Sequence, residues 1–137
     1  MAETIVFTNG CFDLLHPGHI DLLDRAKELG TKLIVGINSD SSVRSIKGPD
    51  RPFQTEDERK AVLLGLKAVD EVVIFDELTP ENLIRRLMPD VLVKGSDYLA
   101  ENIVGADVVK KAGGVVKTIE FVPGYSTSRI VEKIKNI

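Results

Sequence analysis

The sequence is poor in cysteine and carries no excess of positive charge. Its single cysteine, Cys11, excludes an internal disulfide and any Cys-x-x-Cys zinc or redox site. There are 18 lysine and arginine residues against 21 aspartate and glutamate residues, which gives a formal net charge of -3. Since no overall positive field favours nucleic acid, we expect the partners to be small-molecule substrates.

Long apolar runs are absent as well. No stretch approaches the roughly 20 apolar residues that a transmembrane helix needs, and no basic and then apolar signal segment opens the chain. We expect a soluble, cytoplasmic protein without a membrane partner, and a lone cysteine fits that reducing compartment. The 137 residues are close to the commonest domain size, so we expect one domain over residues 1–137.

Strand-like and helix-like patterns alternate along the chain. Apolar runs typical of strands buried on both faces occupy residues 5–7, 33–37, 69–75, 91–93 and 115–121. Apolar residues at helical spacing lie between these runs and after the last one. Because no hairpin signal interrupts this order, we predict an α/β fold, a Rossmann-like doubly wound parallel sheet of about five strands with helices on both faces.

Some connections and helix starts carry signals of their own. Thr55–Glu58 forms a Thr-x-x-Glu capping box, and Thr79 with Pro80 predicts the cap of the next helix. The polar segment 38–53 is long for a connection inside a compact domain, so we expect a binding loop or lid there. Arg59 follows the capping box, and we expect it to form an exposed ion pair worth well under about 1 kcal/mol.

The stretch Thr8–His19 predicts the functional centre. A short apolar strand runs into a glycine-containing turn, and Pro17 and Gly18 then stand where a helix begins. His16 and His19 therefore bracket a helix N-terminus, where unpaired N–H groups and a partial positive charge attract anions. This arrangement predicts a phosphate site.

The histidine pair has two other interpretations. One imidazole could cap the helix while the other packs against the sheet, or the two could chelate a metal from positions i and i+3. They are the only histidines, however, and a zinc site would need Cys11 and Asp13 in addition. We therefore favour phosphate binding and expect no metal held by the protein. Asp13 itself could orient a histidine, hold Mg²⁺ indirectly or bind substrate hydroxyls.

Further polar groups stand near predicted strand and helix ends. Ser126–Ser128 precedes the last helix, either as a simple cap or as a second anion site. Lys47 and Arg51 lie on the polar segment 38–53, where they either face solvent or neutralise phosphate charge. The carboxyl ends of strands, where open α/β sheets bind ligands, are followed by Asp40, Lys94, Gly95, Asp97 and Tyr98. The chain lacks Gly-x-Gly-x-x-Gly and P-loop patterns, so Asp40 does not indicate a dinucleotide site.

A positive pocket without an evident nucleophile suits nucleotidyl transfer between two phosphates. We expect Cys11 to pack beneath the turn and assign it no nucleophilic role. Attack by a phosphate oxygen on the α-phosphorus of a nucleoside triphosphate needs positioning and charge stabilisation, since pyrophosphate is already a competent leaving group. We expect His16, His19 and Lys47 to stabilise the transition state, with Mg²⁺ bridging phosphates.

The central motif resembles the signature of the nucleotidyltransferase (cytidylyltransferase-like) superfamily. That signature is Gly-x-Phe-Asp followed by His-x-Gly-His, and it matches Gly10, Phe12, Asp13, His16, Gly18 and His19. Further stretches resemble the adenylyltransferase domain of bacterial heptose-phosphate enzymes, namely residues 9–13, 35–40, 47–52 and 93–98. Together these stretches lie along nearly the whole chain.

The resemblance implies a reaction and a set of roles. ATP and D-glycero-D-manno-heptose 1-phosphate would give ADP-heptose and pyrophosphate with Mg²⁺, a step towards lipopolysaccharide or other surface glycans. The catalytic residues would be His16, His19 and Lys47. The residues that bind ATP would be Asn9, Gly10, Cys11, Phe12, Gly18, Lys94, Gly95, Ser126, Thr127 and Ser128. The residues that bind the acceptor would be Asp13, Asp40, Arg51, Asp97 and Tyr98. A homodimer is compatible with the resemblance.

Three other functions share these motifs. A glycerol-3-phosphate or related cytidylyltransferase and an FAD synthetase have the same signature and architecture. A catalytically silent nucleotide-binding module is the alternative from another class, although the intact histidine motif argues against it. Asn9, Cys11 and the Lys-Gly-x-x-Arg-Pro pattern at 47–52 favour the heptose type. Side-chain identity does not decide between ATP and CTP.

Overall fold

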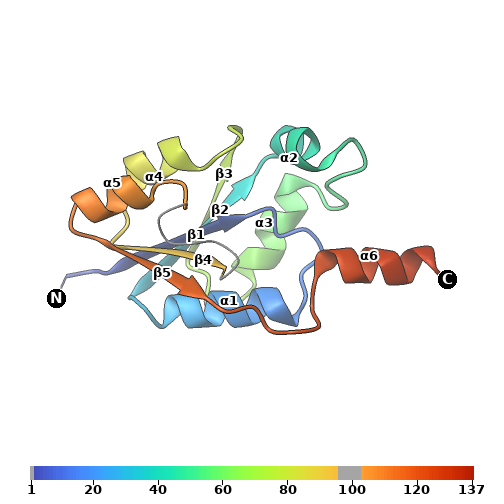
Figure 1. The fold of residues 1–137 in the computed structure, drawn as a ribbon, viewed down its shortest axis with the longest axis horizontal. Coiled ribbons are helices and arrows are strands. Elements are labelled where there is room, and N and C mark those ends of the chain that lie inside the picture. Colours follow the sequence, from blue (N-terminus) through green and yellow to red (C-terminus); the bar gives the residue numbers. More distant parts are fainter. Residues whose placement is uncertain (1, 96–102) are drawn as a thin grey trace.

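The computed structural model describes residues 2–95 and 103–137, so Asp97 and Tyr98 lie outside the described residues. The strands are β1 (Ile5–Gly10), β2 (Lys32–Asn38), β3 (Glu71–Phe75), β4 (Val91–Gly95) and β5 (Val115–Ile119). The helices are α1 (Pro17–Lys27), α2 (Asp40–Lys47), α3 (Glu56–Leu64), α4 (Glu81–Leu87), α5 (Ala106–Lys111) and α6 (Thr127–Lys135) (Figure 1). Within these ranges, no helix is both long enough and apolar enough to cross a membrane.

The five strands form one parallel sheet in the order β3-β2-β1-β4-β5. The central strand β1 pairs with β2 from Ile5 to Gly10 and with β4 at Val6 and Phe7. The chain first adds β2 and β3 on one side of β1 and then returns to add β4 and β5 on the other. The predicted fold class is confirmed. Ligands in such sheets bind at the carboxyl ends of the strands beside this reversal, here β1 and β4.

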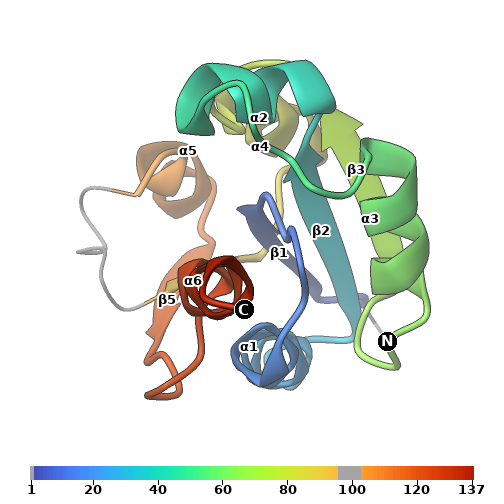
Figure 2. The same ribbon diagram turned by 90° about the vertical axis from the view of Figure 1, so that its right-hand side faces the viewer.

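Apolar layers cover both faces of the sheet. Successive side chains of each strand point to opposite faces, so each strand contributes to both layers. Val6 and Phe7 are successive residues of β1 and are both fully buried. Val6 belongs to one core cluster with Leu23 of α1 and Leu63 of α3, and Phe7 belongs to a second cluster with Leu83 of α4. Helices α1 and α3 therefore cover one face, and α4 and α5 cover the other (Figure 2).

The sequence predicted a loop over the whole polar segment 38–53. The structure instead has a helix in its first half. This helix is α2, which Ser39 caps by accepting a hydrogen bond from the backbone N–H of Ser42 at 3.3 Å. Only Ser42 and Val43 of this helix are buried. The polar residues are therefore the solvent face of a short helix, and the irregular part of the segment begins after Lys47.

The two predicted helix caps have different outcomes. The capping box before α3 is confirmed, because the Thr55 hydroxyl accepts from the backbone N–H of Glu58 at 3.2 Å and the Glu58 carboxylate accepts from that of Thr55 at 2.9 Å. The cap expected at Thr79 is wrong. Helix α4 begins at Glu81 with Pro80 in the cap position and no side-chain hydrogen bond there, so Thr79 lies one residue too early.

Arg59 is buried, and the expectation of an exposed ion pair is wrong. Its side chain is 0% exposed, and one guanidinium nitrogen pairs with the Asp40 carboxylate at 2.9 Å. The other N–H groups donate to the backbone carbonyls of Cys11 (2.9 Å), Asn38 (2.8 Å) and Gln54 (3.0 Å). Arg59 therefore joins the end of β1, the end of β2, the start of α2 and the chain that precedes α3.

Replacing Arg59 should destabilise the fold strongly. The Arg59→Met change keeps much of the volume but leaves three carbonyls and the Asp40 carboxylate without their donor, so the free energy of unfolding should fall by about 3 to 5 kcal/mol in urea denaturation. Arg85→Met is the matched control, because Arg85 pairs with Glu81 while its side chain is 58% exposed. That change should cost less than about 1 kcal/mol. Equal losses from the two variants would mean that the buried guanidinium does not hold these segments together.

Candidate active site

The N-terminus of α1 is closed by the two histidines of the central motif. His16 is the N-cap, and its Nδ1 accepts a hydrogen bond from the backbone N–H of Gly18 at 3.1 Å. Nδ1 of His19 accepts in return from the backbone N–H of His16 at 3.2 Å. A Cβ on Gly18 would lie 2.9 Å from Cε1 of His16, so only glycine leaves room for this ring. The pair is a capping box built from imidazole nitrogens.

These caps also decide which nitrogen of each imidazole is free to donate. A neutral imidazole has one N–H and one acceptor nitrogen. Because Nδ1 is the acceptor in both His16 and His19, Nε2 carries the hydrogen in both rings. The capping half of the first alternative interpretation is therefore confirmed, and His19 is a second cap where that interpretation expected packing against the sheet. Capping does not exclude phosphate binding, since each ring still has an Nε2–H to donate to an anion.

Both imidazoles are held in their neutral form. Burial lowers the pKa of His19 to about 4, and the charges of His16 and Lys47 act in the same direction. Burial also lowers the pKa of His16 below its ordinary value. The two rings lie against each other with their centroids 3.8 Å apart and their planes tilted by 34°, an arrangement in which two positive charges would repel. At neutral pH the pair is therefore a set of two uncharged hydrogen-bond donors.

A hollow of about 260 Å³ opens at the carboxyl ends of β1 and β4. A second hollow of about 480 Å³ continues from it along the start of α6, and His19, Leu22, Lys47, Phe121 and Thr127 line both. The predicted residues that line the first hollow are Asn9, Gly10, Cys11, Phe12, Asp13, His19, Lys47, Lys94, Gly95 and Thr127. Those that line the second are His16, Gly18, His19, Lys47, Arg51, Ser126, Thr127 and Ser128. Most of the predicted site residues are thus brought together.

The start of α6 supplies a second helix N-terminus to this cleft. Ser126 is its N-cap, and the Ser126 hydroxyl accepts from the backbone N–H of Arg129 at 3.0 Å. Thr127 donates its hydroxyl hydrogen to the carbonyl of Asp13 at 2.8 Å. The N-termini of α1 and α6 therefore border one hollow, although the two helices are separated by about a hundred residues in sequence.

Three basic side chains surround the cleft. Lys47 ends α2 and lines both hollows, and the guanidinium of Arg51 lies over the ring of Phe53 at 4.6 Å while it lines the larger hollow. Lys94 of β4 donates to the carbonyl of Asn9 at 2.9 Å and so crosses the point where β1 and β4 end. With neutral histidines, these residues carry the positive charge that an anion would meet.

Two of the three acidic candidates, Asp13 and Asp40, are engaged with the protein itself. Asp13 is buried, and its carboxylate oxygens accept from the backbone N–H groups of Phe53 (2.7 Å) and Gln54 (3.0 Å). Asp40 pairs with Arg59. In this structure Asp13 therefore fixes the segment that carries Arg51, and Asp40 balances the buried guanidinium. Asp97 and Tyr98, the remaining predicted substrate residues, lie outside the described part of the chain.

Some lining residues were not predicted from the sequence. Leu22 lies one helical turn after His19, so helical spacing could have identified it. Phe121 follows β5, and the carboxyl edge of the sheet could have pointed to it. The ring of Tyr125 stacks on that of His16 at a centroid distance of 6.4 Å, a contact that no local pattern predicts.

No protein-held metal site is formed among residues 2–95 and 103–137. Within these ranges no three histidine, cysteine or acidic side chains gather in a way that could hold an ion. Cys11 is half-buried, lines the smaller hollow, and its Sγ lies 3.8 Å from the amide oxygen of Asn38. The acidic side chains beside it bond instead to backbone N–H groups and to a guanidinium.

Comparison with known proteins identifies the family. The sequence model of the cytidylyltransferase-like family matches residues 7–133. The chain belongs to this family. The matched range includes both the histidine motif and the start of α6, so the family pattern extends over both borders of the cleft.

Similar proteins match nearly the whole of this chain, and some of them are several times longer. The Bifunctional protein HldE of Pseudomonas entomophila is 58% identical over 133 residues, which are 97% of this chain and 28% of that protein. The protein of the same name from Syntrophotalea carbinolica is 53% identical over 133 residues, which are 97% and 27% of the respective chains. This cytidylyltransferase-like domain thus spans little more than a quarter of either relative.

Solved structures show the same architecture. The lipopolysaccharide core biosynthesis protein from Thermoplasma volcanium has a TM-score of 0.70 and 30% identity, with 88% of this chain and 98% of that chain covered. A pantothenate synthetase from Thermus thermophilus has a TM-score of 0.61 at 20% identity, with 88% of this chain and 56% of that chain covered, and shares the fold. The first of these proteins has nearly the same extent as this cytidylyltransferase-like domain.

The hydrogen bonds and burial of the histidines predict their NMR behaviour. In ¹⁵N-resolved imidazole spectra of the free protein at pH 7, both rings should show a protonated Nε2 and an unprotonated Nδ1. On acidification, His19 should titrate near pH 4. Since the unfolded chain binds this proton near pH 6.5, the free energy of unfolding should fall as the pH drops from about 6.5 to 4. A His19 pKa at or above 6.5, or an Nδ1–H form, would contradict the assignment.

Proposed function

We propose that this domain is an adenylyltransferase that transfers AMP from ATP to D-glycero-D-manno-heptose 1-phosphate, with release of pyrophosphate. The observation that carries the proposal is the cleft between two helix N-termini, lined by neutral histidine donors and basic side chains. Similarity to the HldE proteins over 97% of the chain supports the heptose acceptor. Their name, bifunctional, and the 28% of their length matched here fit a domain joined to a second activity.

The triphosphate is placed along the larger hollow in this proposal. The N-termini of α1 and α6 would offer it backbone N–H groups and the positive ends of two helices. Nε2–H of His16 and of His19 would donate to oxygens around the α-phosphorus. Lys47 and Arg51 would neutralise the charge of the leaving pyrophosphate.

The chemistry then needs little proton transfer. A phosphate oxygen of the acceptor attacks the α-phosphorus, the new P–O bond forms, and the bond from the α-phosphorus to the bridging oxygen breaks. Both the nucleophile and the leaving pyrophosphate are ionised at neutral pH, so the site has to align the phosphates and stabilise added negative charge. Uncharged imidazole donors suit this task because they need no change of protonation state during the reaction.

Mg²⁺ is proposed to enter with the nucleotide. The described residues offer no acidic cluster for the ion, and the Asp13 carboxylate is occupied by two backbone N–H groups. Phosphate oxygens and water would therefore hold Mg²⁺ as part of the substrate. The ion would neutralise phosphate charge, while the protein residues position the nucleotide.

The acceptor is proposed to approach from the other side of the contact between Lys94 and Asn9. A hollow of about 320 Å³ lies there, and Asn9 and Lys94 line both it and the smaller nucleotide hollow. Its walls are mainly apolar and include Ile46 and Leu78, with Thr79 as a polar neighbour. Such a surface suits the C–H face of a sugar, while an acceptor phosphate can reach Lys94.

Pyrophosphate release tests the reaction directly. ATP and CTP should be crossed with heptose 1-phosphate, glycerol 3-phosphate and FMN in the presence of Mg²⁺. We expect release only with ATP and heptose 1-phosphate. Release with CTP and glycerol 3-phosphate, or with FMN, would replace the substrate, and no release in any combination would favour a nucleotide-binding module.

Two variants that keep the helix cap test whether pyrophosphate release depends on the histidines of this site. His16→Asn retains an N-cap side chain, and His19→Gln retains a residue that completes a capping box. Each removes a donor from the proposed α-phosphate site, so turnover should fall about a hundredfold or more while the thermal midpoint changes little. Unchanged turnover in both would remove the histidines from the mechanism.

Filling the proposed acceptor hollow should affect the acceptor alone. In Leu78→Trp the larger ring occupies part of the hollow, so KM for heptose 1-phosphate should rise about tenfold or more while KM for ATP stays within about twofold. Leu64→Trp makes the same change on α3, where the side chain is 46% exposed, and should alter neither constant. A rise in KM for ATP only would place the acceptor elsewhere.

A further inference from the structure

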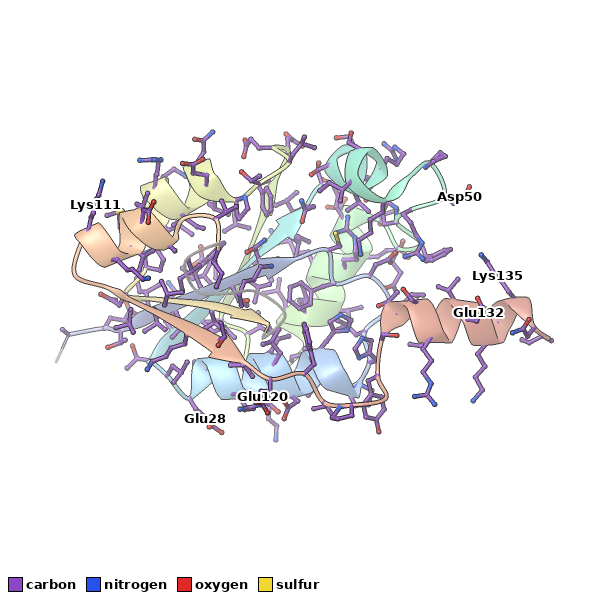
Figure 3. All side chains as sticks on the ribbon, viewed as in Figure 1. Glu28, Asp50, Lys111, Glu120, Glu132 and Lys135 are labelled. Carbon is purple, nitrogen blue, oxygen red and sulfur yellow. The ribbon has the colours of Figure 1, made fainter. Side chains whose placement is uncertain are left out.

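Helix α6 borders the cleft and has little packing to hold it there. None of its residues is buried, and the apolar side chains of Ile134 and, just beyond its end, Ile137 are 58% and 102% exposed. The helix extends away from the sheet (Figure 1), and Glu132 and Lys135 reach into solvent (Figure 3). Ile130 and Val131 are half-buried, so packing acts only on the first part of the helix, and it is there that a side chain of α6 bonds to a distant segment.

The bond is formed by a side-chain hydroxyl. Thr127 Oγ1 donates to the backbone carbonyl of Asp13 at 2.8 Å and lies 3.4 Å from that of Leu14. These partners are 114 and 113 residues away in sequence. The first residue of α6 is thus bonded directly to the turn that precedes α1.

The turn that accepts this hydrogen bond is also bonded to the segment before α3. Phe12 and Leu14 have φ angles of 49° and 57°, in the left-handed region that residues with a side chain seldom adopt. The Asp13 carboxylate bonds to the backbone of Phe53 and Gln54, and Gln54 Oε1 accepts from the backbone N–H of Leu14 at 3.2 Å. Residues 13 and 14 therefore join the start of α1, the segment that bears Arg51, and α6.

We propose that Thr127 is a positioning residue, whose hydroxyl aligns the N-terminus of α6 with that of α1. A threonine hydroxyl has one hydrogen, and here it is donated to a protein carbonyl. Only lone pairs remain on this oxygen, and these repel phosphate oxygens. Thr127 thus acts through the backbone N–H groups that it orients. The effect on catalysis rests on the proposed function, which places the triphosphate between the two helix ends.

Two substitutions at one position test this role. Thr127→Val keeps the shape and removes the hydroxyl, whereas Thr127→Ser keeps the hydroxyl. In Thr127→Val, kcat/KM for ATP should fall about 10- to 100-fold, because displacement of positioning groups by about 1 Å has effects of that size. Thr127→Ser should stay within about threefold of wild type, and KM for the acceptor should be unchanged in both. Thr118→Val, an exposed site on β5, is the matched control and should behave as wild type.

Hydrogen exchange of the nucleotide-free protein separates positioning from direct phosphate contact. Thr127→Val should increase the exchange rate of the Arg129 and Ile130 amides, the first hydrogen-bonded amides of α6, about tenfold, while the sheet amides and the thermal midpoint stay unchanged. Unchanged exchange together with weaker ATP binding would make the hydroxyl a phosphate ligand and overturn the proposal. Unchanged ATP kinetics would also overturn it. Because exchange needs no ligand, it still decides whether Thr127 anchors α6 if the wild-type enzyme uses another nucleotide.

Discussion

The hydrogen bonds from backbone N–H groups to Nδ1 of His16 and His19 are the constraint on which the site depends. They begin α1 at the end of the strand-turn segment and hold both rings over the first turn of the helix. They also leave Nε2 of each ring as a donor. One pair of contacts thus sets where the helix starts and which ring atoms are left to donate a hydrogen bond to an anion. Gly18 is part of the same constraint, because a side chain there would displace the His16 ring.

The parallel sheet brings the other parts of the site to this helix start. The carboxyl ends of β1 and β4 lie side by side, so Lys94 reaches the carbonyl at the end of β1. Arg59 then joins the ends of β1 and β2 from within the core. Beyond the strand ends, neighbouring strands no longer supply backbone N–H donors. The guanidinium donates to the carbonyls there in their place. The candidate site is therefore bonded directly to the carboxyl ends of the sheet strands.

Local patterns predicted the five strands, most of the helices and the histidine cap at the centre of the candidate site. The alternation of strands and helices follows from apolar periodicity, and the histidine motif needs only residues within one turn of a helix. Contacts between distant segments could not be predicted in this way. The burial of Arg59 depends on carbonyls from separate strand ends, and the partners of Asp13 lie about 40 residues away. Helix α2 was missed because its polar solvent face has the composition of a loop.

The neutral state of the histidines has a thermodynamic consequence for ligand binding. A bound polyphosphate brings negative charge next to His19, whose pKa is about 4 in the free protein, and would raise that pKa. In mildly acidic solution the complex would then take up protons as it forms, and its measured enthalpy would include the ionisation heat of the buffer. At a pH well above the pKa of the rings in the complex, the histidines would be neutral with and without the anion, and this exchange would disappear. The affinity for such an anion would therefore increase as the pH falls towards the pKa of His19, although protonation of its Nδ1 would remove the acceptor of the cap.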